Sequence, residues 1–274
     1  MNRFAGLGLA LLTCSIGGLA APAHADAPAP LLSPGPNVYS GYGAVAPSFS
    51  VLSAHWTQPS VNCPSSLEGA IGGLSNTVQT GSSILKIPGM AAQPDGVIGT
   101  TFVPHVATWI GMVGMNGPTD RTLIQTGTVT VCQDGVAHPM GFFETPSFDN
   151  QAGEPDLDAN VPDTMWGTPA TDPGDAIEAT VTWDGSSSYR LIVANTTKGW
   201  KYGATFHSSV VPTGALTVLE SIPYNVPGYS PVTFTDVTAD GKPFGAYETH
   251  TFNIEGPNIA PGALNDKSFT VPSP

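Results

Sequence analysis

The amino-acid sequence predicts an all-β protein, an antiparallel sandwich of two sheets. Short segments alternate apolar and polar residues with a period of two, and turn-forming residues separate these segments. The 274 residues include 32 Gly and 27 Pro, which are frequent in turns and disfavoured inside helices. Hydrophobic residues make up 41% of the chain, which is enough to form a core. About ten strands of this kind are typical of a sandwich.

The clearest strand lies at residues 176–183, where every odd-numbered position is apolar and positions 178, 180 and 182 are polar. This alternation predicts a strand with one buried face. Asp184-Gly185 follows as a turn signal, and the alternation resumes over residues 189–193, so we expect a hairpin. Comparable segments predict further strands near residues 49–57, 105–113, 122–132, 136–145, 200–211, 216–222, 232–238 and 245–255.

The N-terminal 25 residues have the features of a secretory signal peptide. A basic residue precedes an apolar run, and Ala23-His24-Ala25 supplies the small-x-small pattern of a cleavage site. No later stretch is apolar over the roughly 20 residues that span a bilayer. The sequence therefore predicts a secreted, extracellular protein that has no membrane partner once the signal is removed.

The remaining chain is expected to form one domain over residues 39–274. Residues 26–38, which are rich in Ala and Pro, are predicted to be a flexible mature N-terminus. Two stretches near residues 64–100 and 147–175 are dense in Gly, Pro, Asp and Ser and predict long loops inside the domain.

The charge balance excludes whole classes of partner. The chain carries 8 Lys+Arg against 21 Asp+Glu, a formal net charge of −13. Such a protein repels the phosphates of nucleic acids and anionic lipids, so we expect neither as a partner. The sequence does not define an oligomeric interface, and a monomer is our expectation.

The cysteine and histidine pattern favours a disulfide over a metal site. Cys63 and Cys132 remain after signal removal, and a pair of cysteines in an exported protein predicts a disulfide. Neither has the CxxC or closely spaced His partner of a zinc site. The sequence also lacks the HExxH, GxSxG and GxxxxGK[ST] motifs. We therefore expect no metal and no cofactor.

Two polar residues share the apolar side of their strands. On a regular strand Gln125 points to the same side as Leu123 and Val129, and Glu220 to the same side as Leu216. A carboxylate in such a place is costly unless it is paired, protonated or at a cleft. A bulge that turns each residue outward, or a purely structural hydrogen bond, is the alternative.

Several segments, taken in order, resemble the glutamic peptidases, the eqolisin family of secreted acid proteases. Residues 53–63 read SAHWTQPSVNC and are similar to the family's SGxWxxPxVxC segment. Trp109-Ile110-Gly111 and Gln125-Thr126-Gly127 resemble its WVG…QTG segment, and residues 141–146, GFFETP, resemble its AWYExYP strand. The agreement in order covers roughly residues 40–240.

The resemblance implies a lectin-like, concanavalin A-like sandwich with a substrate cleft on one concave face, a polypeptide substrate and a glutamine–glutamate catalytic pair. In this interpretation Glu220 is the general base on a water, and Gln125 donates a hydrogen bond to the developing oxyanion. Trp109, Phe143 and Glu144 are the expected substrate-binding residues.

The region of the base departs from the family pattern. The family motif resembles AEWIVE, with the catalytic glutamate first, whereas residues 215–220 read ALTVLE. Direct alignment puts Leu216 at the catalytic position, and an alternative register puts Glu220 there. A secreted acid endopeptidase is the leading hypothesis. An inactive lectin-like sandwich that binds peptide or glycan is the alternative, and a surface protein without a ligand is the third possibility.

Overall fold

A computed structural model describes residues 38–64, 104–116, 120–144, 169–221 and 226–274. All of these residues belong to one compact unit, Leu31–Pro274. The predicted signal peptide and most of the predicted N-terminal segment and of both predicted long loops lie outside the described residues.

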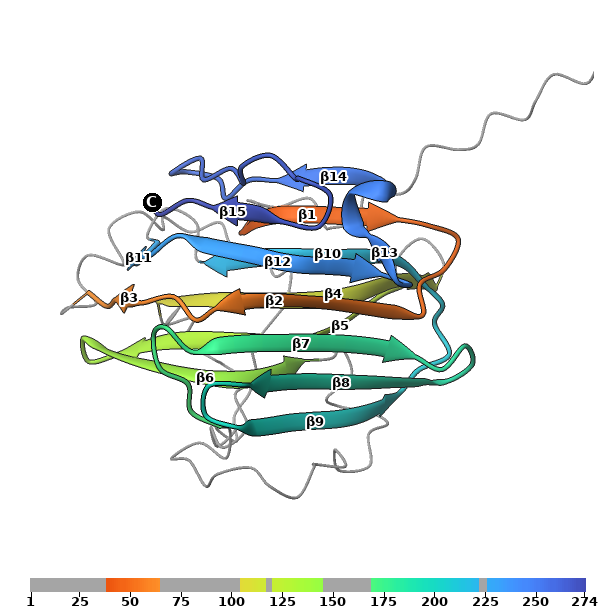
Figure 1. Ribbon diagram of the computed structural model, residues 1–274, viewed down its shortest axis with the longest axis horizontal. Helices are drawn as coiled ribbons and strands as arrows, with labels where there is room; N and C mark the ends of the chain where they lie inside the picture. The colour runs from red at the N-terminus through yellow and green to blue at the C-terminus, as the bar shows by residue number, and fades with distance from the viewer. Residues whose placement is uncertain (1–37, 65–103, 117–119, 145–168, 222–225) are drawn as a thin grey trace, which may run out of the picture. The chain divides into compact units, whose positions relative to one another are not determined.

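Two antiparallel sheets form the fold, as predicted from the sequence. Sheet A has the strand order β14-β1-β10-β4-β5-β6, and sheet B has the order β13-β12-β2-β7-β8-β9, with β15 also paired to β12. Figure 1 shows the sheets as stacked layers, with sheet B in front. The strands of sheet A are β1 (Tyr39–Val45), β4 (His105–Asn116), β5 (Asp120–Gln133), β6 (Val136–Glu144), β10 (Pro212–Ser221) and β14 (Glu248–Phe252). Those of sheet B are β2 (Val51–Thr57), β7 (Ala176–Trp183), β8 (Ser188–Asn195), β9 (Trp200–His207), β12 (Val232–Ala239), β13 (Lys242–Pro243) and β15 (Phe269–Val271).

Two smaller elements complete the described chain. A two-stranded ribbon pairs β3 (Val61–Asn62) with β11 (Gly228–Tyr229), and η1 (Phe244–Ala246) is one turn of 3-10 helix. No helix in the described residues is long and apolar enough to cross a membrane.

The predicted hairpin is confirmed. β7 and β8 pair in register from Ile177 opposite Asn195 to Trp183 opposite Tyr189, and Gly185 at the turn has a φ of +87°. That backbone conformation is readily accessible to glycine. The inward residues of β7 and β8, among them Val181 and Leu191, are fully buried.

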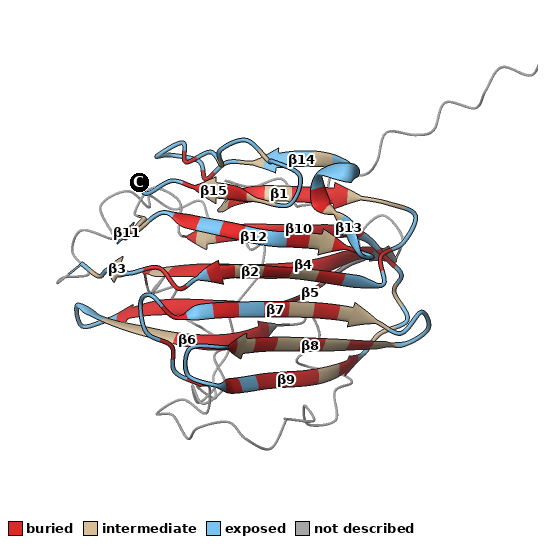
Figure 2. Cartoon of the chain, in the orientation of Figure 1, coloured by how far each residue is buried: buried red, intermediate tan, exposed pale blue. Residues whose placement is uncertain are grey.

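The main core lies between the two sheets. It includes Ile110 and Ile124 from sheet A and Val181, Leu191 and Phe234 from sheet B, and Figure 2 shows buried positions interleaved with less buried ones along several strands. Because one cluster contains residues from both sheets, these side chains point into the space between the layers.

The inner face of β5 adds polar groups to this core. Thr128 Oγ1 accepts a hydrogen bond from Trp56 Nε1 at 3.2 Å, and Thr130 Oγ1 accepts one from Gln58 Nε2 at 3.2 Å. These bonds join β5 of sheet A to β2 of sheet B and to the residues that directly follow β2. The threonines of β5 therefore face sheet B, and the apolar residues that alternate with them face the other way.

The predicted disulfide is present. Cys63 and Cys132 are bonded, with their Cα atoms 5.3 Å apart. The bond joins the segment after β3 to the end of β5, which fixes the β3–β11 ribbon to sheet A.

Candidate active site

The register of sheet A arranges residues in rows that cross the strands. Residues directly opposite each other on antiparallel strands carry their side chains on the same face. We name three successive rows on one face by a residue in each. The Gln125 row contains Gly43, Leu216, Gly111, Gln125 and Glu144; the Trp109 row contains Gly41, Val218, Trp109, Gly127 and Phe142; and the Glu220 row contains Tyr39, Glu220, Ala107, Val129 and Met140.

These rows lie on the face of sheet A that is turned away from sheet B, which we call the outer face. A second apolar cluster contains Trp109, Val129, Leu216 and Val218 together with other residues of β4, β5, β6 and β10, and no residue of sheet B. The expectation that Gln125 and Glu220 share the apolar side of their strands is therefore confirmed. That side is the outer face, not the space between the sheets.

Gln125 stands in β5 with its side chain 3% exposed. Its neighbour across β4 is Gly111, at a position where a Cβ atom would come within 2.9 Å of Gln125 Cβ and 3.0 Å of the Ile124 carbonyl oxygen. Glycine is therefore required beside Gln125, because any larger residue would push against the amide-bearing side chain.

Glu220 stands in β10 and is half-buried. Its Oε2 accepts a hydrogen bond from Trp109 Nε1 at 2.8 Å. Burial raises the pKa of Glu220 to about 7, although the Trp109 hydrogen bond acts in the opposite direction. The Trp109 ring in turn meets the Tyr39 ring edge-on, with centroids 5.5 Å apart.

The structure does not bring Gln125 and Glu220 together. They belong to rows separated by the Trp109 row, four residues apart along the strand direction and two strands apart across the sheet. At ordinary strand spacings this is about 13 Å along and about 10 Å across, or roughly 16 Å between Cα atoms. One water molecule cannot touch both side chains, so the predicted pairing of Gln125 with Glu220 is corrected.

Leu216 occupies the place in the Gln125 row that direct alignment assigns to the catalytic glutamate. It is fully buried and pairs with Gly111, which pairs with Gln125. The register of β10 against β4 is regular from Gly214 to Ser221. Because the strand has no bulge in that interval, Glu220 cannot take the place of Leu216.

Of the expected substrate-binding residues, Trp109 lies on the outer face and Phe143 does not. Phe143 belongs to the main core, stacked on Tyr202 with ring centroids 4.7 Å apart and meeting Phe206 at 5.7 Å. The expectation for Phe143 is therefore wrong. Its neighbour Phe142 belongs to the outer cluster, because successive residues of a strand point to opposite faces.

Glu144 is the residue of β6 paired with Gln125. The pairing of β5 with β6 runs without a shift from Gln133 opposite Val136 to Gln125 opposite Glu144. Sequence reasoning assigned Glu144 to substrate binding and did not connect it with Gln125, since nothing in the sequence gives the register between two strands.

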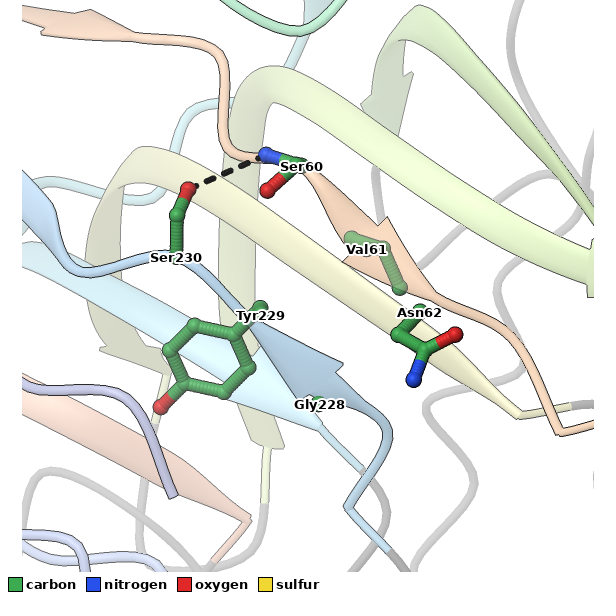
Figure 3. Close-up of a pocket in the computed structure, with 6 residues that line it drawn as sticks. All are labelled: Ser60, Val61, Asn62, Gly228, Tyr229 and Ser230. Carbon is green, nitrogen blue, oxygen red and sulfur yellow. Dashed lines mark hydrogen bonds between the residues drawn. The ribbon is translucent and has the colours of Figure 1, made fainter.

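A separate pocket of about 460 Å³ lies at the β3–β11 ribbon (Figure 3). It contains none of the residues proposed from the sequence. The lining residues are Ser60, Val61, Asn62, Gly228, Tyr229 and Ser230.

Two solved structures have a fold similar to that of this chain. The structure of SCP-B, a member of the eqolisin family of peptidases in complex with the tripeptide Ala-Ile-His, has a TM-score of 0.53 and 17% identity, covering 87% of this chain and 98% of that one. The crystal structure of scytalido-glutamic peptidase with a peptide-based transition-state analogue has a TM-score of 0.54 and 16% identity over the same shares. This likeness shows the fold.

The sequence itself assigns the family. No curated protein sequence matches the chain. Residues 39–269 match the sequence model of the peptidase A4 family. Because this match spans far more than half of the 274 residues, the chain belongs to the peptidase A4 (eqolisin) family of peptide-bond hydrolases.

Proposed function

We propose that this protein is an exported endopeptidase that binds an extended polypeptide across the outer face of sheet A and cleaves it beside Gln125. The single observation that carries the proposal is the position of Gln125 in the middle of an apolar face, next to Gly111 and opposite Glu144. Family membership and the peptide ligands of the two related structures support a polypeptide substrate.

The chemistry requires an oxyanion donor and a base. The carboxamide of Gln125 carries N–H donors and does not titrate, so it can donate to the carbonyl oxygen of the scissile bond at any pH. A carboxylate then takes a proton from the attacking water, and the same group can return it to the leaving amine. Neither step forms a covalent bond to the protein.

We propose Glu144 as this carboxylate. The register puts Glu144 directly opposite Gln125 on the neighbouring strand, and directly opposite residues of an antiparallel pair are close neighbours. Glu220 lies two rows away and is hydrogen-bonded to Trp109. We therefore assign the role of general base to Glu144, which the register pairs with Gln125, and not to Glu220.

Export and an acidic working range belong to the same proposal. The disulfide between Cys63 and Cys132 favours an oxidising compartment, in agreement with the signal peptide predicted from the sequence. An unperturbed glutamate ionises near pH 4.3, so a glutamate base becomes active in mild acid.

The experiment is an assay of the chain without its first 25 residues on a denatured protein at about pH 3–5, where a glutamate begins to ionise. Gln125→Ala and Glu144→Gln are expected to lower kcat/KM at least about 100-fold, the size of effect typical of oxyanion donors and of general bases. Glu178→Gln is the matched control, because Glu178 is an exposed glutamate of sheet B. Full activity of both site variants would overturn the proposal.

Leu216 favours a second candidate function, in which the protein binds polypeptide without cleaving it. An apolar side chain stands in the Gln125 row where the family motif has its acid. Binding of denatured protein by the unmodified chain, with no cleavage between pH 3 and pH 8, would establish this function in place of the first.

A further inference from the structure

We infer that Glu220, Trp109 and Tyr39 form a subsite for a positively charged Lys or Arg side chain of a polypeptide bound on the outer face of sheet A. The inference rests on the proposed binding face and deepens it. It gives Glu220 a role in specificity, separate from the reaction at Gln125.

The geometry fixes a carboxyl group beside two aromatic rings. Trp109 Nε1 donates to Glu220 Oε2 at 2.8 Å, and Tyr39 meets Trp109 edge-on at 5.5 Å and 89°. Tyr39 is also the cross-strand partner of Glu220. The hydrogen bond occupies Oε2, so Oε1 remains as an acceptor for a ligand. Glu220 and Tyr39 are partly exposed and can contact a ligand, whereas Trp109 is fully buried and holds the carboxyl group in place. Carboxylates and aromatic rings each attract Lys and Arg.

Among the described residues, the two influences on the Glu220 carboxyl group are burial and the Trp109 hydrogen bond, and neither is a cation. The lysines Lys198 and Lys267 pair with other carboxylates. A half-buried carboxylate is unfavourable without a positive partner, and binding a cation removes much of that cost. Burial accordingly raises the pKa of Glu220 to about 7, and a bound ammonium or guanidinium would lower it again.

The other titratable groups around Glu220 come from the neighbouring strands. Tyr39 on β1 belongs to the same row, and His105 on β4 and His138 on β6 belong to the next row, where both pair with Val131 of β5. Protonation of Glu220 removes the negative charge that attracts a cationic ligand. Preference for Lys is therefore expected to increase as the pH rises through 7.

The subsite also has a defined place along the substrate. Glu220 lies roughly 16 Å from Gln125 by strand spacing, and an extended chain advances about 3.3 Å per residue. The Lys or Arg is thus expected four or five residues from the residue at Gln125. A subsite predicts a preference for Lys or Arg at one position of the peptide. A general attraction between an acidic protein and basic peptides would show no such dependence on position.

The test measures binding of fluorescent decapeptides by anisotropy in the Gln125→Ala chain, so that the peptides stay intact. One series moves a single Lys through an otherwise neutral sequence, and a second series carries norleucine instead. The prediction is at least a 10-fold tighter Kd for Lys at one position at pH 8, falling toward equality at pH 5. Glu220→Gln is expected to abolish this preference at pH 8, and Glu178→Gln to leave it unchanged.

The outcomes separate the two proposals. Tight binding of both series with equal affinity, or a Lys preference that persists in Glu220→Gln, would overturn the subsite and leave the binding face intact. Failure of every peptide to bind either the Gln125→Ala chain or the unmodified chain would overturn the proposed function, and the subsite with it. Circular dichroism of each variant shows whether the fold is retained.

Discussion

Leu216 and Gln125 lie in one cross-strand row of sheet A, separated only by Gly111. A glutamate at position 216 would therefore face the amide of Gln125 across a residue without a side chain. The same row continues to Glu144 on the other side of Gln125. The row thus has an apolar residue on one side of Gln125 and an acidic residue at the paired position on the other.

Leu216→Glu is expected to increase hydrolysis of denatured protein in acid, because it places a carboxylate in the Gln125 row, on the other side of Gly111. Leu216 is fully buried, so burial of the charged form is also expected to lower stability at neutral pH. Both effects are measured on one preparation, as kcat/KM at pH 4 and as the urea midpoint at pH 4 and pH 7.

Leu216→Gln is the control for that substitution, since glutamine is nearly as large and polar as glutamate but cannot act as a base. Equal activity of the Glu and Gln variants would show that a carboxylate at this position does not take part in the reaction.

Glu220 is expected to contribute more to stability in acid than at neutral pH. Its folded-state pKa of about 7 lies above the ordinary value of 4.5, so the folded state binds the proton more tightly. Its contribution to stability is therefore full below pH 4.5, decreases between pH 4.5 and 7, and stays low above that range. The loss is at most about 3 kcal/mol.

Urea unfolding at a series of pH values measures this effect. Glu220→Gln should remove the slope between pH 4.5 and 7 while leaving stability in acid nearly unchanged. A slope that is the same in the variant would assign the pH dependence to other groups.

Gly111→Ala should damage the site through sterics alone. The added Cβ would lie 2.9 Å from Gln125 Cβ, so we expect displacement of the amide, a loss of activity of at least about 10-fold and a lower Tm. Gly228→Ala is the matched control, because a Cβ there meets only Asn62 Cβ at an ordinary 3.6 Å. Equal effects of the two substitutions would refute the steric explanation.

The disulfide is expected to contribute substantially to stability. Cys63 and Cys132 are 69 residues apart in the sequence, and closing a loop of that length corresponds to about 4 kcal/mol in the chain-entropy description. Cys63→Ser with Cys132→Ser should lower the free energy of unfolding by several kcal/mol, measured in urea. An unchanged urea midpoint and slope would contradict this expectation.

Patterns local to one strand could be predicted from the sequence. The alternation of residues 176–183 gave the bounds of β7, and strand parity put Gln125 and Glu220 on one face with Leu216. The alternation of residues did not predict the strand Tyr39–Val45, because two glycines interrupt it; the resemblance of Ser40-Gly41-Tyr42 to the family's first strands did. The alternation did not predict the strand β15 either, because its three residues are too few to show it.

Relations between strands could not be predicted. The alternation of side chains along each strand predicts that Gln125 and Glu220 share a face. The distance between them depends on how β10 pairs with β4 and how β4 pairs with β5. For the same reason the sequence did not connect Glu144 with Gln125. The sequence pattern did not show which of the neighbouring residues Phe142 and Phe143 lies on the outer face. The structure puts Phe142 there and Phe143 in the main core.

Cleavage of a denatured protein at pH 4 by the unmodified chain, Gln125→Ala and Glu144→Gln, followed by mass spectrometry of the products, tests the proposed roles of Gln125 and Glu144. Internal cleavage by the unmodified chain is expected, with a loss of at least about 100-fold in each variant. Cleavage that is unaffected by both substitutions, or no cleavage by the unmodified chain, would contradict these roles.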